Sequence, residues 1–286
     1  MTLREIAFVV PAHPAVEGEG MPIRRALPAR NLPLLDPFLL LDHFGPLALE
    51  PGGEGGIPDH PHRGFQTLTY LLQGALEHKD SRGGHGRLAP GGAQWMNAAS
   101  GIVHSEMPVP EVREAGGTIE GLQLWINLPA ALKGEAPGYL DVQADAIPTV
   151  ALPGGTLRVL AGAWAGATGP VPLKSPWAWA YLDLAPGATF THDLPEGWNA
   201  AIYVRSGEGT AGPADRSVKG GDLAVLKAEP GGLTITATTP LQALLLTGRP
   251  LGEPIARYGP FVMNTEAEIH QAFEDYRAGR MGFIPR

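Results

Sequence analysis

Two histidines separated by one proline are the residues whose spacing first suggests chemistry. His60 and His62 flank Pro61 in the segment Asp59-His-Pro-His-Arg-Gly64. Side chains at positions i and i+2 of an extended chain point to the same side. Pro61 fixes its own φ and disfavours a helical conformation for the residue before it, so His60 is expected to be extended. We therefore expect the two imidazole rings to face the same space, as metal ligands do.

A second pair with the same spacing lies in the segment Gly101-Ile-Val-His-Ser-Glu-Met107, where His104 and Glu106 are two residues apart. On a strand, this parity places both side chains on one face. Alone the pair is a weak signal. Combined with the first pair, it supplies a set of three neutral imidazoles and one carboxylate. The sequence therefore predicts a metal site formed by His60, His62, His104 and Glu106.

The chemistry of this ligand set limits which metals and roles fit. The chain contains no cysteine, which removes disulfides, thiolate ligands and cysteine nucleophiles and makes a closed structural zinc site less favoured. Imidazole and carboxylate ligands suit Fe(II), and also Mn, Ni, Cu or Zn. An octahedral ion with four protein ligands keeps two positions open. Open positions serve a catalyst or a gas-binding centre, whereas a purely structural site has no need of them.

The charge and composition of the chain exclude other classes of protein. With 21 basic and 29 acidic residues the formal net charge is -8, and no basic stripe is present to meet phosphate, so direct nucleic-acid binding is not expected. No apolar run approaches the roughly 18 residues of a membrane span. The apolar stretch 6–10 is too short for a signal-peptide core. We therefore expect a cytoplasmic protein without a membrane segment.

The elements that must position these residues are expected to be strands. The 286 residues, with 39 glycines and 29 prolines, favour an all-β fold with many short strands and two domains. In the first half, residues 65–72 and 121–128 alternate as strands do. Residues 50–58 and 79–87 are Gly-rich and are predicted to be loops, the first of them a candidate lid over the histidine pair.

The proline-containing stretch 130–148 is interpreted as the boundary between the halves. It divides the chain into a metal-binding domain, residues 1–135, and a second domain, residues 136–286. Strands are expected in the second domain at 157–162, 178–184, 200–204, 222–226, 233–237 and 241–246. A helix is expected near the end, because Thr265 and Glu268 form a capping box. Its apolar stripe consists of Ile269, Ala272, Phe273 and Tyr276, and Gly279 ends it.

The two halves resemble each other weakly. Residues 66–74 and residues 199–207 both run from an amide side chain through an apolar strand to a glycine. An internal duplication of one barrel accounts for this similarity, although chance similarity between strands is the alternative. Counting back from the two glycines puts Asp193 and Pro195 at the places of His60 and His62. His192 is one place off, so the second barrel is expected to be structural and free of metal.

Three further histidines are weaker candidates for ligands: His43, His78 and His85. We interpret them as loop histidines, which are usually solvated.

Several segments together resemble the signature of the pirin family, from about residue 24 to residue 283. They are Asp59-His-Pro-His-Arg-Gly-Phe-Gln-Thr67, Gln94-Trp-Met-Asn97, Gly101-Ile-Val-His-Ser-Glu-Met107, Gly121-Leu-Gln-Leu-Trp-Ile-Asn-Leu-Pro129, Asp36-Pro-Phe-Leu-Leu-Leu-Asp-His-Phe44 and Gly259-Pro-Phe-Val-Met-Asn264. The resemblance implies two tandem cupin barrels, of the double-stranded β-helix or jelly-roll type. It also implies one metal, usually iron, in the N-terminal barrel, with ligands falling on His60, His62, His104 and Glu106.

The chain departs from the general cupin pattern at two places. Gln66 stands where ordinary cupins carry a glutamate ligand, and Trp95 stands where their last histidine should follow the Pro-Gly turn at residues 90–91. The resemblance implies that His104 and Glu106 take over this ligand function. Many pirins carry glutamate at the place of Gln66, where it is not a ligand. Little damage to metal binding is therefore expected from Gln66, and an effect on the surroundings of the ligands is the alternative.

The resemblance also implies what the metal does. The enzymatic activity is flavonol (quercetin) 2,3-dioxygenation, in which O₂ opens the heterocycle and carbon monoxide is released. Glu106 would then be both ligand and general base, and Trp95, Met96 and Trp125 are candidates to line the pocket or to be ordinary core. The rival function is an iron-dependent regulator that binds a protein partner. A storage or structural cupin is a third, weaker alternative.

Overall fold

The computed structural model describes residues 2–18, 20–53 and 55–285. Residue contacts group the chain into two compact units. One, which we call the histidine unit, comprises Pro14–Arg24, Phe38–Ala144 and Leu251–Arg286; the other, the apolar unit, comprises Met1–His13, Arg25–Pro37 and Asp145–Pro250. The domain boundary between residues 135 and 136 that the sequence suggests stays a prediction. In the described ranges, no helix is long and apolar enough to cross a membrane.

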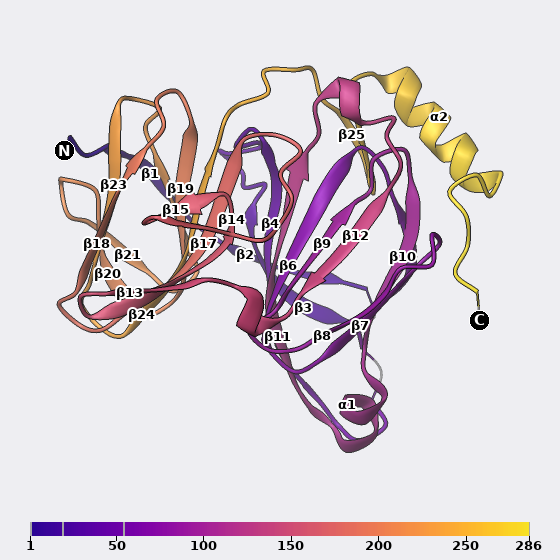
Figure 1. Ribbon diagram of the computed structural model, residues 1–286, viewed down its shortest axis with the longest axis horizontal. Coiled ribbons are helices and arrows are strands. Elements are labelled where there is room, and N and C mark those ends of the chain that lie inside the picture. Colours follow the sequence, from indigo (N-terminus) through magenta and orange to yellow (C-terminus); the bar gives the residue numbers. More distant parts are fainter. Residues whose placement is uncertain (1, 19, 54, 286) are drawn as a thin grey trace. The chain divides into compact units, whose positions relative to one another are not determined.

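The strands of the histidine unit form two antiparallel sheets, one of seven strands and one of four (Figure 1). The seven-stranded sheet has the order β12 (Gly138–Val142), β9 (Ala93–Asn97), β6 (Phe65–Gln73), β11 (Gly117–Asn127), β4 (Phe38–Leu49), β3 (Met21–Leu27) and β2 (His13–Glu17). The four-stranded sheet has the order β5 (Ile57–His62), β10 (Ile102–Pro108), β7 (Leu76–Asp80) and β8 (His85–Leu88). His13 at the start of β2 and residues 25–27 at the end of β3 belong to the apolar unit, and all other residues of these strands lie in the histidine unit.

The apolar unit repeats this arrangement. Its seven-stranded sheet has the order β1 (Ile6–Pro11), β22 (Asp222–Leu226), β19 (Asn199–Ser206), β24 (Leu241–Gly248), β17 (Trp177–Leu184), β14 (Gly155–Ala161) and β13 (Thr149–Leu152). Its four-stranded sheet has the order β18 (Thr189–Leu194), β23 (Gly231–Ala237), β20 (Glu208–Ala211) and β21 (Arg216–Lys219). The expectation of an all-β fold with two barrels and a terminal helix is confirmed.

The matching strand orders support the internal duplication suggested by the sequence. The two similar segments are β6 and β19, which occupy the same third place in their sheets. Each ends at a glycine with positive φ, Gly74 at 84° and Gly207 at 86°. A Cβ atom at either glycine would meet a carbonyl oxygen of the adjacent strand region, Thr118 or Pro240. Both turns therefore require glycine for the same physical reason.

Short elements complete the chain. They are α1 (Pro110–Ala115), the 3₁₀ turns Ala130–Leu132 and Ala144–Ala146, and the small hairpins β15 (Ala163–Trp164) with β16 (Ala167–Thr168) and β25 (Ala256–Tyr258) with β26 (Phe261–Met263). The expected strands at residues 65–72 and 121–128 lie in β6 and β11. The prediction of a loop at 79–87 is wrong at both ends, because β7 and β8 form a hairpin there around a turn at Asp80–Gly84. The candidate lid loop separates β4 from β5, and Glu54 within it lies outside the described residues.

The terminal helix α2 (Glu266–Arg277) begins at the predicted capping box, in which Thr265 and Glu268 bond each other's backbone amides. Ile269 and Ala272 of the predicted stripe are buried, but Tyr276, which was also predicted to belong to it, is 40% exposed. The buried residues pack with Val103 and Phe261 in one cluster. The contacts thus place α2 (yellow in Figure 1) with the histidine unit, whereas the sequence attached it to the second domain.

Candidate metal centre

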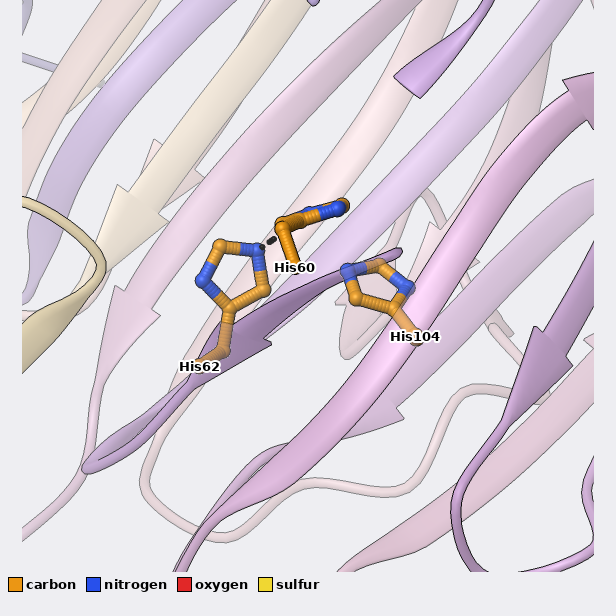
Figure 2. A group of neighbouring side chains, drawn as sticks. All are labelled: His60, His62 and His104. Atoms are coloured by element: carbon orange, nitrogen blue, oxygen red, sulfur yellow. Dashed lines mark hydrogen bonds between the residues drawn. The ribbon is translucent and has the colours of Figure 1, made fainter. Parts of the chain in front are cut away.

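Three imidazole rings converge between the sheets of the histidine unit. His60 and His62 come from β5, and His104 comes from the adjacent strand β10, directly opposite His60 in the register. One ligand nitrogen from each ring lies within 4.8 Å of the others, and the Nε2 atoms of His60 and His62 are 3.0 Å apart. Figure 2 shows the three rings gathered around one small space. The extended segment expected around Pro61 thus turns both of its histidines to the same side.

Burial keeps the imidazoles of His62 and His104 in the form that binds a metal. His104 is completely buried and His62 is 5% exposed, whereas His60 is half-buried. Desolvation, followed by the positive charge that His60 would carry, lowers the pKa of both His62 and His104 well below the usual value. Neutral imidazole is the ligand form. The Nε2 atom of His104 is buried without a hydrogen-bond partner, which is the state expected of a nitrogen whose partner is a metal ion.

Glu106 lies two residues further along β10, beyond an irregularity in its pairing with β5. Glu106 is only 6% exposed, and its carboxylate accepts hydrogen bonds at both oxygens. Gln94 donates to Oε1 at 3.1 Å, Thr69 donates to Oε1 at 3.3 Å, and Gln123 donates to Oε2 at 3.1 Å. Among the described residues, the group within 4.8 Å consists of the three histidines and does not include Glu106.

A pocket opens beside Glu106. Its polar lining includes Gln123, Asp42 and Glu17, and it reaches Gly56 at the end of the expected lid loop. Its apolar walls are Met21, Ile23, Phe44, Ile57 and Leu76. A pocket with apolar walls and a few fixed polar groups suits a small aromatic ligand. The sequence analysis missed these wall residues, because they come from strands distant in the sequence.

Of the residues expected to line the pocket, Trp125 lies closest to the histidines. Its ring contacts that of His62 with the centroids 5.0 Å apart, and it stacks on Phe65 at 4.2 Å. Trp95 and Met96 are buried on β9. The indole nitrogen of Trp95 donates to Oε1 of Gln66 at 3.0 Å. The two residues that depart from the cupin pattern therefore bind each other.

His78 is the residue whose place the sequence analysis misjudged. It lies on β7, opposite Glu106 in the register of β10, and is completely buried. Its Nδ1 atom is 3.4 Å from Nδ1 of His104 and 3.3 Å from Nε2 of Gln94, and its Nε2 is 3.0 Å from Oδ2 of Asp80. Its ring stacks on Tyr139 at 4.0 Å. The sequence did contain one indication of this arrangement: His78 and Asp80 are two residues apart, the same spacing as in the two predicted ligand pairs.

Asp80 is held as a carboxylate by its surroundings. Its Oδ1 accepts hydrogen bonds from the backbone amides of Arg82 and Gly84 at 2.7 and 2.9 Å. Burial alone would raise the pKa of Asp80, but the hydrogen bonds from His78 and these amides outweigh it, so the pKa lies below its usual value. An ionised Asp80 can only accept a hydrogen bond from His78.

The remaining histidine candidates lie apart from this cluster. His43 is buried in β4 rather than in a loop, and its Nε2 lies 2.8 Å from Glu120. His85 is exposed and pairs with Glu77 at 2.9 Å. In the apolar unit, the ring of His192 contacts Trp164 at 4.8 Å. The part of the chain that the structure describes contains no second cluster of three candidate ligands.

Comparison with family models agrees with this arrangement. A model described as Pirin matches residues 20–126. A second model, described as the Pirin C-terminal cupin domain, matches residues 179–282. The two matches cover more than half of the chain and fall on both halves, including the segments that carry His60, His62, His104 and Glu106.

Individual proteins are similar over nearly the whole chain. A pirin-like protein from Solanum lycopersicum is 41% identical, covering 93% of this chain and 89% of its own length. A Pseudomonas aeruginosa protein named "Putative quercetin 2,3-dioxygenase" is 42% identical, covering 92% and 93%. The crystal structure of a quercetin 2,3-dioxygenase from Acinetobacter baumannii superposes with a TM-score of 0.94 at 37% identity, covering 99% of this chain and 100% of that one.

Proposed function

Because this chain belongs to the pirin family, we propose that it is a metal-dependent flavonol 2,3-dioxygenase. One divalent metal per chain would be held by His60, His62, His104 and Glu106. We propose Fe(II) because of the resemblance to pirins, although the ligand chemistry also suits Mn, Ni, Cu or Zn. The substrates would be a flavonol and O₂. Both oxygen atoms of O₂ enter the ring-opened product, and one carbon of the heterocycle leaves as carbon monoxide.

One observation carries this proposal: a buried imidazole nitrogen without a partner stands in a cluster of three histidines, and Glu106, two residues from His104 on the same strand, lines a pocket with apolar walls. A structural site would be expected to close its ligand shell, whereas three histidines and one carboxylate leave positions for substrates. Two Pseudomonas aeruginosa relatives about 40% identical, both named "Putative quercetin 2,3-dioxygenase", support the same class of reaction.

The residues around the pocket define what the protein itself contributes. The metal, when bound, supplies a Lewis acid that stabilises a deprotonated flavonol hydroxyl. Glu106 faces the pocket and would accept the proton of that hydroxyl. Gln94 and Gln123 hold one carboxylate oxygen each, so the base keeps its orientation before the substrate arrives. The apolar walls would bind the flat aromatic rings and exclude water.

The test is the Glu106→Gln variant. The amide keeps the shape and one oxygen ligand but removes the charge and most of the basicity. We expect weakened but measurable metal binding, since three imidazoles remain, and a fall in turnover of roughly 10²–10⁴-fold, typical for the loss of a general base. Metal content and the bleaching of flavonol absorbance are measured on the same sample.

The control is Glu111→Gln, which removes an exposed carboxylate bound to Arg87 and should leave both quantities unchanged. A Glu106→Gln enzyme with its metal and near-normal turnover would exclude Glu106 as the base. An iron-loaded unmodified protein that never turns over a flavonol would favour the alternative function, an iron-dependent regulator that binds a protein partner. The acidic net charge of -8 is compatible with such a partner.

A further inference from the structure

We propose that His78 is a positioning residue that fixes the tautomer of His104 and so prepares its Nε2 atom to bind the metal. The proposal rests on the metal site of the proposed function, but it concerns a residue outside the ligand set. Its basis is a chain of contacts that runs from Asp80 through His78 to His104 inside the histidine unit.

The direction of this chain follows from Asp80. Two backbone amides donate to Oδ1 of Asp80 and favour its ionised form, and an ionised carboxylate has no hydrogen to donate. The contact between Oδ2 and Nε2 of His78 is therefore a hydrogen bond that His78 donates. His78 must therefore carry its proton on Nε2. A neutral imidazole has one protonated nitrogen, so Nδ1 of His78 is left with a lone pair.

A second observation gives the same result from the other side of the ring. One hydrogen of the Gln94 amide is directed to the carboxylate of Glu106 at 3.1 Å, and the same nitrogen lies 3.3 Å from Nδ1 of His78. An amide nitrogen can only donate. Nδ1 of His78 therefore accepts, in agreement with the direction set by Asp80.

The acceptor on His78 decides which of the two ring nitrogens of His104 carries the proton. The Nδ1 atom of His104 lies 3.4 Å from Nδ1 of His78, whose lone pair also faces the amide of Gln94. Two lone pairs facing each other at this distance would repel, so His104 carries its proton on Nδ1 and shares the His78 acceptor with Gln94. Its Nε2 is then the lone-pair nitrogen, and this is the buried atom without a partner. Figure 2 shows one nitrogen of the His104 ring turned toward the other imidazoles and the second turned away. Hydrogen bonds of this kind orient ligand histidines and raise their basicity.

The same amide connects the two parts of the ligand set. Gln94 contacts His78 with one hydrogen and Glu106 with the other. A change at Asp80 or His78 is therefore expected to reach His104 directly and Glu106 through Gln94.

The first measurement needs no variant and no metal. In the metal-free protein with ¹⁵N-labelled histidine, the imidazole nitrogen shifts report which nitrogen of His104 is protonated. We expect the proton on Nδ1 at neutral pH. A proton on Nε2 of His104 in the unmodified protein would overturn the proposal.

The second measurement is the affinity for Co(II), obtained by competition with a chelator. His78→Phe keeps a ring that can stack on Tyr139 but removes the acceptor. Asp80→Asn keeps the oxygen that accepts from the turn amides but turns an amide donor toward Nε2 of His78. This reverses the direction of the hydrogen bonds that run from His104 through His78 to residue 80. Each variant should lose roughly 10–100-fold in affinity and should shift the His104 proton to Nε2.

Two controls separate positioning from a general loss of structure. His78→Asn places an amide oxygen near the lost Nδ1 acceptor, and we expect it to recover most of the affinity. His85→Phe removes another histidine that pairs with a carboxylate, Glu77, but does not contact His104, and should leave the affinity unchanged. If His78→Phe, with an unaltered thermal midpoint in the metal-free state, bound Co(II) as tightly as the unmodified protein, the proposal would be wrong.

The outcome is distinguishable from that of the proposed function. A protein that binds metal and shows the expected tautomer but never converts a flavonol would contradict the dioxygenase and leave the role of His78 intact. Should the His78→Phe chain fail to fold, Asp80→Asn and the tautomer of the unmodified protein still decide the question.

Discussion

The two units use the same strand order around interiors of different polarity. In the histidine unit, Thr69 on β6 is paired with Gln94 on β9 and with Gln123 on β11. All three side chains donate hydrogen bonds to Glu106. The sheet thus presents a row of polar donors toward the four-stranded sheet that carries the histidines.

The apolar unit has hydrocarbon at the matching places. Ile202 on β19 is paired with Ala224 on β22 and with Leu245 on β24, and these strands hold the same places in the sheet order. All three residues are completely buried in one apolar cluster. The row that supports a carboxylate in one unit is therefore ordinary core in the other.

This difference shows that the fold itself does not require the polar row. Buried polar groups stabilise little in net terms and cost free energy whenever a partner is lost. The apolar unit forms the same sheets without them. The polar groups of the histidine unit are best explained by the chemistry they support, and the following substitutions test this comparison.

The largest effect is expected from removing the paired histidines. The double variant His60→Ala, His62→Ala should reduce the bound metal from one ion per chain to none, because two imidazole ligands are lost together. Elemental analysis of protein purified from the same metal-supplemented culture measures this. Metal retained by the variant, or two ions in the unmodified protein, would mean that the apolar unit or another site binds metal.

The second-largest effect is expected from replacing a residue of the polar row by its counterpart in the apolar unit. Gln123→Leu introduces the residue found at the equivalent place in the apolar unit. It removes the hydrogen bond to Oε2 of Glu106, and loss of a bond to a charged group is worth about 1.5–3 kcal/mol, or roughly 10–100-fold in turnover. The variant also leaves a buried carboxylate oxygen without this donor, so the free energy of unfolding of the metal-free protein in urea should fall by at most about 3 kcal/mol. A large loss of stability with normal turnover would reverse our interpretation of the polar row.

The reverse exchange, Leu245→Gln, should act on stability instead. It places an amide at a completely buried position of the apolar cluster, whose side chains are hydrocarbon apart from the indole nitrogen of Trp164. Burying an unpaired amide costs about 1–3 kcal/mol by comparison with other proteins. Unfolding by urea is the measurement, and metal content serves as the control because it should stay at the unmodified level. An unchanged midpoint would show that this interior tolerates polar groups.

The smallest effect is expected from removing an ion pair that joins α2 to the segment after β5, and it concerns stability at low pH. Arg63, the residue after His62, forms an ion pair with Asp275 at 2.7 Å. Burial alone would raise the pKa of Asp275, but hydrogen bonds from Gln271, Arg63 and Arg280 lower it to about 2. A carboxyl group with a lowered pKa stabilises the folded state above its unfolded pKa, near 3.9, and this contribution is lost as the pH falls toward 2.

Asp275→Asn should therefore weaken the pH dependence of stability between about pH 4 and pH 2. Thermal unfolding at a series of pH values gives the result, with Glu111→Gln as the exposed control. Equal slopes for Asp275→Asn and the unmodified protein would show that this pair does not contribute to acid stability.

Much of the local structure could be predicted, because its causes lie within a few residues. The capping box at Thr265 and Glu268 fixed where α2 begins. The alternating segments correctly located β6 and β11. The helix α1 and the β7–β8 hairpin were missed: the first is only six residues long, and the second lies in a segment with too few apolar residues to show alternation.

The candidate site was predictable only where its residues are neighbours in sequence. Parity and the stiffness of Pro61 were enough to turn His60 and His62 together. Parity also applied to His78 and Asp80, but nothing in the sequence indicated that β7 lies beside β10, so His78 was assigned to a solvated loop. Its burial against His104 depends on the register of two strands.

The amino-acid sequence by itself determined the all-β character, the family and the two close pairs of residues that are the candidate ligands. Tertiary structure decided which distant residues meet: Gln94 and Gln123 at Glu106, and His78 at His104. The physical reason is that strand pairing joins residues far apart in sequence, and a shift of one residue reverses every side chain. The irregularity between His104 and Glu106 is such a local departure, and it lies in the middle of the ligand set.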